Sequence, residues 1–183
     1  MTTELIRTMA QDSAARARRA GWIIAIAALI LDQASKNLLL YGYDFGRLGP
    51  LARIVVLPFL DLVMVWNRGV SYGLLQAGGL TGTLVLTAFS LVAVAVLSWW
   101  MARADRISLT AGLGLIIGGA LGNVIDRILY GAVADFFHFH AFGRDWYVFN
   151  VADAAITIGV IILLVDAFLR PESGSEGRRQ SGT

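Results

Sequence analysis

Four long apolar stretches constrain the fold of this chain more than any other feature. A helix that crosses a membrane needs about 20 mostly apolar residues to span a hydrocarbon core of about 30 Å. Four stretches meet this requirement, over residues 21–41, 80–101, 108–128 and 150–169. Only 15% of the residues are charged, below the roughly one quarter that is usual in soluble domains. The sequence therefore predicts an α-helical integral membrane protein with four transmembrane helices.

The arginines indicate how these helices are oriented. Nine of them lie before the first stretch, between the second and third, or after the fourth: Arg7, Arg16, Arg18, Arg19, Arg103, Arg106, Arg170, Arg178 and Arg179. The other two connecting segments contain only Arg47, Arg53, Arg68 and Arg144. Because basic residues favour the cytoplasmic side, we expect both termini in the cytoplasm. The net charge of +2 does not indicate a nucleic-acid partner.

We expect one integral domain over residues 21–170. Residues 1–20 form a polar cytoplasmic segment before it, and residues 171–183 form a mobile cytoplasmic tail; the first dozen or so residues are also expected to be mobile. The first apolar stretch continues past Asp32 and Lys36 without an evident small-residue cleavage site, so it is interpreted as a permanent helix and not as a cleaved signal peptide. The absence of cysteine excludes disulfides and thiolate chemistry.

A shorter apolar segment, residues 54–66, differs from the four spans. It contains Pro58 and Asp61 and is rich in residues that favour strands. We therefore predict a hairpin of residues 54–59 and 62–66, followed by a turn. Such a flap would lie at the outer membrane surface, and the family resemblance described below implies that its connecting segment forms a small extracytoplasmic β-sheet.

Charged residues inside apolar stretches are costly, about 2.5 to 3.5 kcal/mol each on insertion scales, and are functional candidates for that reason. Asp32 and Lys36 are four residues apart, so they share one helix face and can pair. This pair is either a structural ion pair or a direct substrate contact. In both cases its face should point into the helix bundle.

The third apolar stretch has two kinds of pattern. Glycines at intervals of four form a ridge that lets another helix approach closely: Gly114, Gly118 and Gly122. Near its end, Asn123, Asp126 and Arg127 share one face. The ridge predicts helix packing, and Arg127 is either part of a site or an interfacial anchor.

Asp135 and Asp153 form the most informative pair. Asp135 lies in the apolar sequence VADFF after the third stretch, and Asp153 lies in the first turn of the fourth helix. Apolar surroundings raise the pKa of a carboxyl, whereas a helix N-terminus favours its ionised form. If the two carboxyls meet, one can act as base and the other as acid in peptide hydrolysis by a bound water. Spacing alone specifies this chemistry weakly.

His138 and His140 raise the question of a metal site. No Glu lies at metalloprotease spacing and no cysteine can complete a zinc site, so we expect no metal and no other cofactor. An interfacial aromatic role is favoured, shared with Trp146 and Tyr147.

Five sequence blocks, in order along nearly the whole chain, resemble the motif set of the bacterial lipoprotein signal peptidases, also called signal peptidase II. They are DQASK at residues 32–36, NRGVSY at 67–72, GGALGNVIDR at 118–127, GAVADF at 131–136 and FNVAD at 149–153. The clearest departure is Tyr72, where the family pattern suggests Phe.

The resemblance implies a multi-pass aspartyl endopeptidase of the bacterial inner membrane, with its active site at the extracytoplasmic surface. Such an enzyme cleaves diacylglyceryl-modified prolipoproteins before the lipidated cysteine, in contact with membrane lipid, and is sensitive to globomycin. It further implies that Asp135 and Asp153 are catalytic, and that the first extracytoplasmic segment forms the sheet while the segment after Asp135 covers the site. Substrate-binding or site-supporting roles are implied for Asp32, Lys36, Asn67, Gly119, Asn123, Asp126, Arg127 and Asn150, with Asp126 as the main rival for a catalytic role.

Two other functions remain open at this point. A small proton-coupled transporter would use Asp32, Lys36, Asp126 and Asp153 as a relay, although such relays favour the membrane midplane and repeated halves. A non-catalytic membrane adaptor would use the glycine ridge for pairing, but it leaves the costly carboxylates unexplained.

Overall fold

The computed structural model describes residues 1–43, 45–48, 53–69 and 80–169. Among them, four helices are long and apolar enough to cross a membrane. They are α1 (Thr2–Asn37), which continues as the π-helical η1 (Leu38–Gly42), α3 (Leu80–Met101), α4 (Ile107–Tyr130) and α5 (Val151–Phe168). Their central parts match the four predicted spans. The predicted tail, 171–183, and Tyr72 lie outside the described residues.

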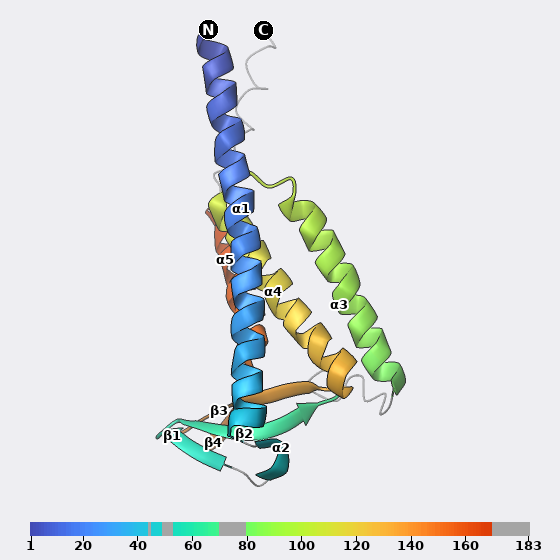
Figure 1. The fold of residues 1–183 in the computed structure, drawn as a ribbon. Coiled ribbons are helices and arrows are strands. Elements are labelled where there is room, and N and C mark those ends of the chain that lie inside the picture. Colours follow the sequence, from blue (N-terminus) through green and yellow to red (C-terminus); the bar gives the residue numbers. More distant parts are fainter. Residues whose placement is uncertain (44, 49–52, 70–79, 170–183) are drawn as a thin grey trace, which may run out of the picture.

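The first helix starts earlier than the apolar pattern suggested. It begins at Thr2 instead of near Gly21, so the polar residues that we expected to be mobile are helical. Their side chains are mostly exposed, and this part of α1 extends beyond the other helices (Figure 1). Alanine and arginine are good helix formers, which explains why the helix begins well before the apolar stretch does.

Glycines let α4 pack closely between α1 and α5. A Cβ atom on Gly118 would lie 2.3 Å from the backbone oxygen of Ala25 in α1. On the other side, a Cβ on Gly119 would lie 2.5 Å from the backbone oxygen of Ala152 in α5. Both distances are shorter than real carbon–oxygen contacts, so the helix backbones touch at these points. The predicted packing role of the glycine ridge is confirmed.

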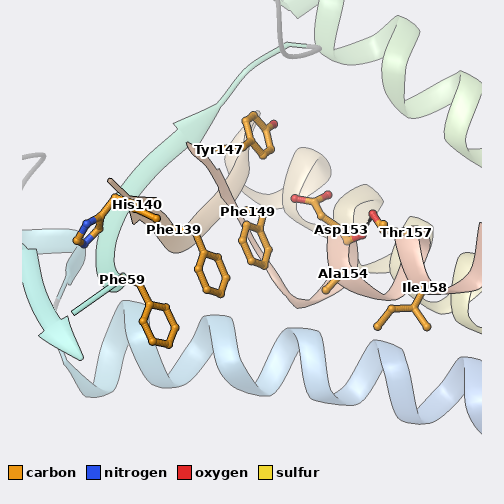
Figure 2. Close-up of a pocket in the computed structure, with 10 residues that line it drawn as sticks. Phe59, Phe139, His140, Tyr147, Phe149, Asp153, Ala154, Thr157 and Ile158 are labelled. Atoms are coloured by element: carbon orange, nitrogen blue, oxygen red, sulfur yellow. Dashed lines mark hydrogen bonds between the residues drawn. The ribbon is translucent and has the colours of Figure 1, made fainter. Parts of the chain in front are cut away.

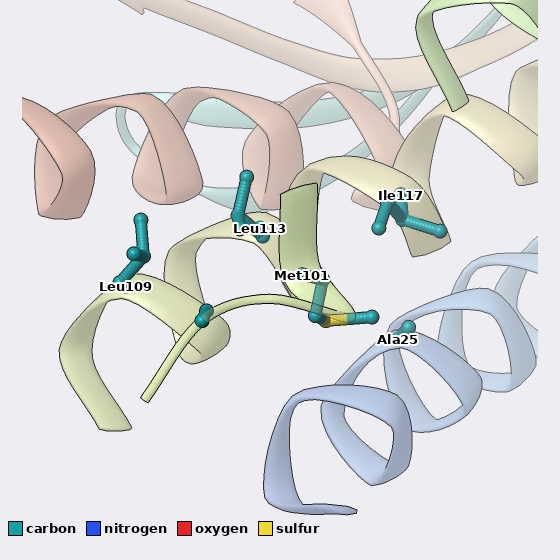
Figure 3. Close-up of a cluster of buried hydrophobic side chains, with 6 residues drawn as sticks. Ala25, Met101, Leu109, Leu113 and Ile117 are labelled. Atoms are coloured by element: carbon teal, nitrogen blue, oxygen red, sulfur yellow. The ribbon is translucent and has the colours of Figure 1, made fainter. Parts of the chain in front are cut away.

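A small apolar cluster joins α1, α3 and α4 at the end of the bundle where α3 and α4 connect. The side chain of Met101, which is fully buried, lies between Ala25 of α1 and the residues of α4 (Figure 3). Leu113 and Ile117 complete the contact from α4. This cluster holds the bundle together away from the polar residues.

The other end of the bundle carries a four-stranded antiparallel sheet (Figure 1). Its strands are β1 (Arg53–Leu57), β2 (Leu60–Asn67), β3 (Val133–Ala141) and β4 (Arg144–Phe149), in the order β1-β2-β3-β4. The predicted hairpin corresponds to β1 and β2. The strands β3 and β4 come from the segment that we expected only to cover the site, so Asp135 lies within the sheet itself.

A second apolar cluster attaches the sheet to the end of α1. It contains Leu39 and Leu40 of η1, Phe45 of the short helix α2 (Phe45–Leu48), and Phe136 of β3. Phe45 and Phe136 meet edge to face with ring centroids 6.4 Å apart. Because β3 is held here at Phe136, its neighbour Asp135 points to the opposite face of the strand, toward α5.

Candidate active site

The first turn of α5 is organised by Asn150 and Asp153. The Asn150 side chain accepts a hydrogen bond from the Asp153 backbone N–H at 2.9 Å, and the Asp153 Oδ2 accepts from the Asn150 backbone N–H at 3.3 Å. This reciprocal capping box satisfies two donors that would otherwise lack a partner at the helix start. It also sets the position of the Asp153 carboxylate relative to the helix N-terminus.

The same Asn150 side chain reaches Asp135. Its Nδ2 donates to Asp135 Oδ1 at 2.6 Å, and Asn67 Nδ2 donates to Asp135 Oδ2 at 3.1 Å. Asp135 is almost completely buried, with 1% of its surface exposed. Asn150 therefore contacts both carboxylates, so β3 and α5 bring Asp135 and Asp153 to one site.

The surroundings of Asp135 favour its protonated form. Burial, and after it the negative charge of Asp153, raise the pKa of Asp135 to about 7, although the hydrogen bonds from Asn67 and Asn150 act in the opposite direction. Asp153 is only half-buried. One carboxyl that holds a proton near neutral pH thus lies beside a second that is open to an adjoining cavity.

Asn123 and Arg127 of α4 complete the surroundings of Asp153. Asn123 Nδ2 donates to Asp153 Oδ1 at 2.9 Å, and its Oδ1 accepts from Asn150 Nδ2 at 3.3 Å. Arg127 is half-buried and lies within electrostatic reach of Asp153, Asp135 and Asp126. This places Arg127 at the site instead of at a separate interfacial position.

Lys36 forms a buried ionic network behind the site. Its Nζ lies 2.8 Å from both Asp32 Oδ2 and Asp126 Oδ2, and all three side chains are at most 3% exposed. Asp32 Oδ1 accepts from the backbone N–H of Ala152 at 2.9 Å, in the first turn of α5. The predicted pair of Asp32 and Lys36 is present, points into the bundle as expected, and supports α5 next to Asp153.

Asp126 contacts the supporting network and the start of β3. Its Oδ2 accepts from the backbone N–H of Ala134, the residue before Asp135, at 3.1 Å. Its Oδ1 accepts from Gln33 Nε2 at 3.1 Å. Asp126 therefore holds β3 in position beside α4, and Gln33 is a supporting residue that the sequence patterns did not single out.

A largely apolar cavity of about 720 Å³ adjoins Asp153. Phe59, Phe139 and Phe149 form a row of rings that leads from the β1–β2 turn toward α5 (Figure 2). The ring planes are nearly parallel, with centroids 6.2 Å apart for Phe59 and Phe139 and 5.5 Å apart for Phe139 and Phe149. Only the folded sheet brings these three residues together, which is why sequence inspection did not identify them.

The histidines of β3 contact a buried carboxylate, and their interfacial role stays a prediction. His140 Nε2 lies 2.9 Å from Asp61 Oδ2, and His138 Nδ1 lies 3.9 Å from the same oxygen. Asp61 is fully buried and also pairs with Arg53. The two histidines alternate along one strand, so both face Asp61 of the neighbouring strand β2.

A bundle of membrane-spanning helices that presents two neighbouring carboxylates beside a cavity, with one of them able to hold a proton near neutral pH, has the groups that a membrane aspartic endopeptidase needs. The comparisons with known proteins identify the particular kind. The family model described as signal peptidase (SPase) II matches residues 24–169. The chain belongs to the signal peptidase II family.

Relatives and solved structures agree with this assignment. The lipoprotein signal peptidase of Nitrobacter hamburgensis is 53% identical over 156 residues, which cover 83% of this chain and 93% of that protein. The lipoprotein signal peptidase of Methylorubrum extorquens is 56% identical over 153 residues, covering 84% and 87%. A solved structure described as a bacterial membrane enzyme is 28% identical, with a TM-score of 0.68 and coverage of 82% and 94%.

Proposed function

We propose that this protein removes the signal peptide from diacylglyceryl-modified prolipoproteins by cleaving before the lipidated cysteine, with Asp135 and Asp153 as its catalytic pair. The observation that carries the proposal is the position of Asn150. Its side chain donates to Asp135 at 2.6 Å while it forms the capping box with Asp153. The two carboxylates are thereby held in one site next to the apolar cavity.

In this mechanism Asp135 acts as the acid and Asp153 as the base. Asp153 takes a proton from a bound water, and the water oxygen attacks the scissile carbonyl carbon. Asp135 donates its proton to the carbonyl oxygen as the tetrahedral intermediate forms. When the carbon–nitrogen bond breaks, the cysteine nitrogen receives the proton held by Asp153 and leaves as an amine. Asp135 takes a proton back from one hydroxyl of the intermediate, which becomes the new carboxyl group of the signal peptide, and the pair returns to its starting state. The raised pKa of Asp135 supports this division of roles.

The supporting residues hold this pair in place. Asn123 and Asn150 donate to the carboxylates, Asn67 holds the second oxygen of Asp135, and Arg127 contributes positive charge near both. Behind them, a second group fixes the start of α5 and of β3 and lets the helices approach: Asp32, Lys36, Gly119 and Asp126.

The row of phenylalanines beside Asp153 would accept an apolar part of the substrate. The cavity is lined by aromatic and aliphatic side chains from β3, β4 and α5, with Asp153 at one side (Figure 2). Such a surface binds apolar side chains or acyl chains of a substrate, and a few polar groups near the carboxylates provide the specificity. Lipid-exposed side chains on α5, such as Ile158 and Ile161, continue this apolar surface into the membrane region.

The orientation follows from the basic residues. Arg103 and Arg106 lie in the α3–α4 connection, at the end of the bundle opposite the sheet (Figure 1). With both termini in the cytoplasm, the sheet and the two carboxylates lie at the extracytoplasmic surface of the inner membrane. The lipid-modified cysteine of a precursor would reach the site there while its acyl chains remain in lipid.

Cleavage of a purified diacylglyceryl-modified prolipoprotein by the detergent-solubilised protein tests the proposal. Asp135→Asn and Asp153→Asn should each lower kcat by at least about 10³-fold, because either change removes one of the two proton-transfer groups. Asp166→Asn is a matched control, since Asp166 lies near the far end of α5 and binds Arg106. Asp126→Asn should keep partial activity, because Asp126 supports β3 and does not line the cavity.

Full activity in either Asp135→Asn or Asp153→Asn would refute the assignment of the pair. Globomycin should inhibit wild-type cleavage in the same assay, and a precursor without the diacylglyceryl group should be cleaved poorly. Absence of cleavage by a folded wild-type protein would refute the proposed function as a whole.

A further inference from the structure

Tyr147 of β4 lies next to the amide that holds Asp135, although it is outside the sequence blocks that indicated the site. Its hydroxyl oxygen accepts a hydrogen bond from Asn67 Nδ2 at 3.1 Å. The same nitrogen donates to Asp135 Oδ2, also at 3.1 Å. Tyr147 is 40% exposed and lines the cavity beside Asp153 (Figure 2). A single amide group thus connects a residue of the cavity wall with a buried carboxyl.

The three contacts of Asn67 determine how its amide is oriented. Its Oδ1 accepts from the backbone N–H of Gly69 at 3.1 Å, and its two N–H groups have two acceptors, Tyr147 and Asp135. Rotating the amide by half a turn would turn Nδ2 toward the Gly69 N–H, losing that hydrogen bond, and would leave Asp135 Oδ2 without a donor from Asn67, whereas the Tyr147 hydroxyl can accept or donate and so fits either orientation. The Gly69 contact therefore sets the orientation of the amide, and the Tyr147 hydroxyl helps to hold its Nδ2 in place beside Asp135.

We propose that Tyr147 is a positioning residue for the cleavage reaction, which acts through Asn67 to keep a hydrogen-bond donor on Asp135. This inference rests on the proposed function, because it assumes that Asp135 takes part in proton transfer. Tyr147 itself transfers no proton. Its contribution is to hold the Asn67 amide in place, so that Asp135 keeps the same hydrogen bonds in every catalytic cycle.

The charges around Asp135 determine what a loss of this contact would do. Asp153 faces it from α5, Lys36 from α1, and Arg127 from α4. The hydrogen bond from Asn67 favours the ionised form of Asp135 and lowers its pKa. If the bond weakens, the pKa of Asp135 rises, so the carboxyl keeps its proton to a higher pH.

The test is the pH dependence of kcat/KM for prolipoprotein cleavage in Tyr147→Phe. Cleavage requires protonated Asp135, so activity falls as the pH rises through its pKa, and this alkaline limb should move upward by about half a pH unit. Asn67→Ala should move the limb in the same direction by about one pH unit. Tyr147→Phe added to Asn67→Ala should have no further effect, because both act on one hydrogen bond.

Tyr41→Phe is the matched control. It removes a hydroxyl that pairs with Tyr130 at 3.1 Å, away from Asn67, and it should leave the alkaline limb unchanged. An unmoved limb in Tyr147→Phe, additive effects in the double variant, or a change confined to KM would each overturn the proposal. Because Tyr147→Phe is measured in an active enzyme, such a failure is distinct from retention of activity in Asp135→Asn, which would refute the catalytic pair.

Discussion

Replacement of Lys36 by methionine tests how the charged residues are accommodated inside the bundle. Lys36 is the only lysine in the sequence. Its ammonium group lies 2.8 Å from one carboxylate oxygen of Asp32 and 2.8 Å from one of Asp126. Methionine keeps the length and apolar character of the side chain, so Lys36→Met removes the charge with little change in volume.

The size of the expected loss in the free energy of unfolding follows from the burial of the two carboxylates. Asp32 is 0% exposed and Asp126 is 1% exposed, so solvent cannot replace the lost ammonium group. Removing one partner of a buried ion pair costs about 3–5 kcal/mol, because the remaining charge stays buried without compensation. Here two carboxylates lose their common partner, and we expect the free energy of unfolding to fall by an amount in this range.

Equilibrium unfolding in mixed detergent micelles, followed by tryptophan fluorescence, measures this change. Ser35→Ala is the matched control on the neighbouring position. Its hydroxyl donates only to the backbone oxygen of Asp32 within the same helix, at 2.8 Å. We expect Ser35→Ala to alter the free energy of unfolding by less than about 0.5 kcal/mol.

A second substitution distinguishes charge compensation from a general packing defect. Asp126→Asn in the Lys36→Met background removes one of the two uncompensated carboxylates, so the double variant should be more stable than Lys36→Met alone. Additive losses in the double variant, or a loss below about 1 kcal/mol in Lys36→Met, would refute the reasoning.

Three further predictions follow from the packing and the site. Folding raises the pKa of Asp135 to about 7, so between about pH 4 and pH 7 the folded state holds a proton that the unfolded chain releases. The free energy of unfolding of wild type should therefore fall as the pH rises from about 4 to about 7. Asp135→Asn should lack this fall when its unfolding is measured at the same two pH values. Gly118→Ala should cost about 1–3 kcal/mol in the same unfolding assay, since its Cβ would meet the Ala25 oxygen at 2.3 Å, whereas Gly42→Ala meets only a flexible side chain. Asn150→Ala should cost about 0.5–2 kcal/mol through loss of the helix cap and should also abolish cleavage, measured on prolipoprotein.

Periodicity and hydropathy were sufficient for the helical part of the fold. The four spans were predicted close to their observed centres because a membrane helix must satisfy its own backbone hydrogen bonds and bury apolar side chains along its length. The start of α1 at Thr2 was not predicted, because hydropathy reports where a helix enters the membrane and not where it begins. The strands β3 and β4 were not predicted either, since their burial follows no simple alternation.

The site residues were predicted unevenly. Asp135 and Asp153 stood out as carboxylates near one surface of an apolar sequence, and the resemblance to the signal peptidase II motifs then singled them out as the pair. Their catalytic roles stay a prediction. Tyr147 and Asp61 were not linked to any partner, because their contacts cross between strands that are far apart in the sequence. Aromatic and acidic residues at such positions have no distinctive local spacing.

By itself, the sequence determined that the chain lies in a membrane, how many helices cross it, and which polar residues require partners there. These properties depend on composition and on spacing within single helices. The tertiary structure alone decided that Asn150 joins Asp135 to Asp153, that Lys36 compensates two carboxylates, and that three phenylalanines form one wall of a cavity. Hydrogen bonds and ion pairs act over a few ångströms, so they depend on how helices and strands meet in space and not on their separation along the chain.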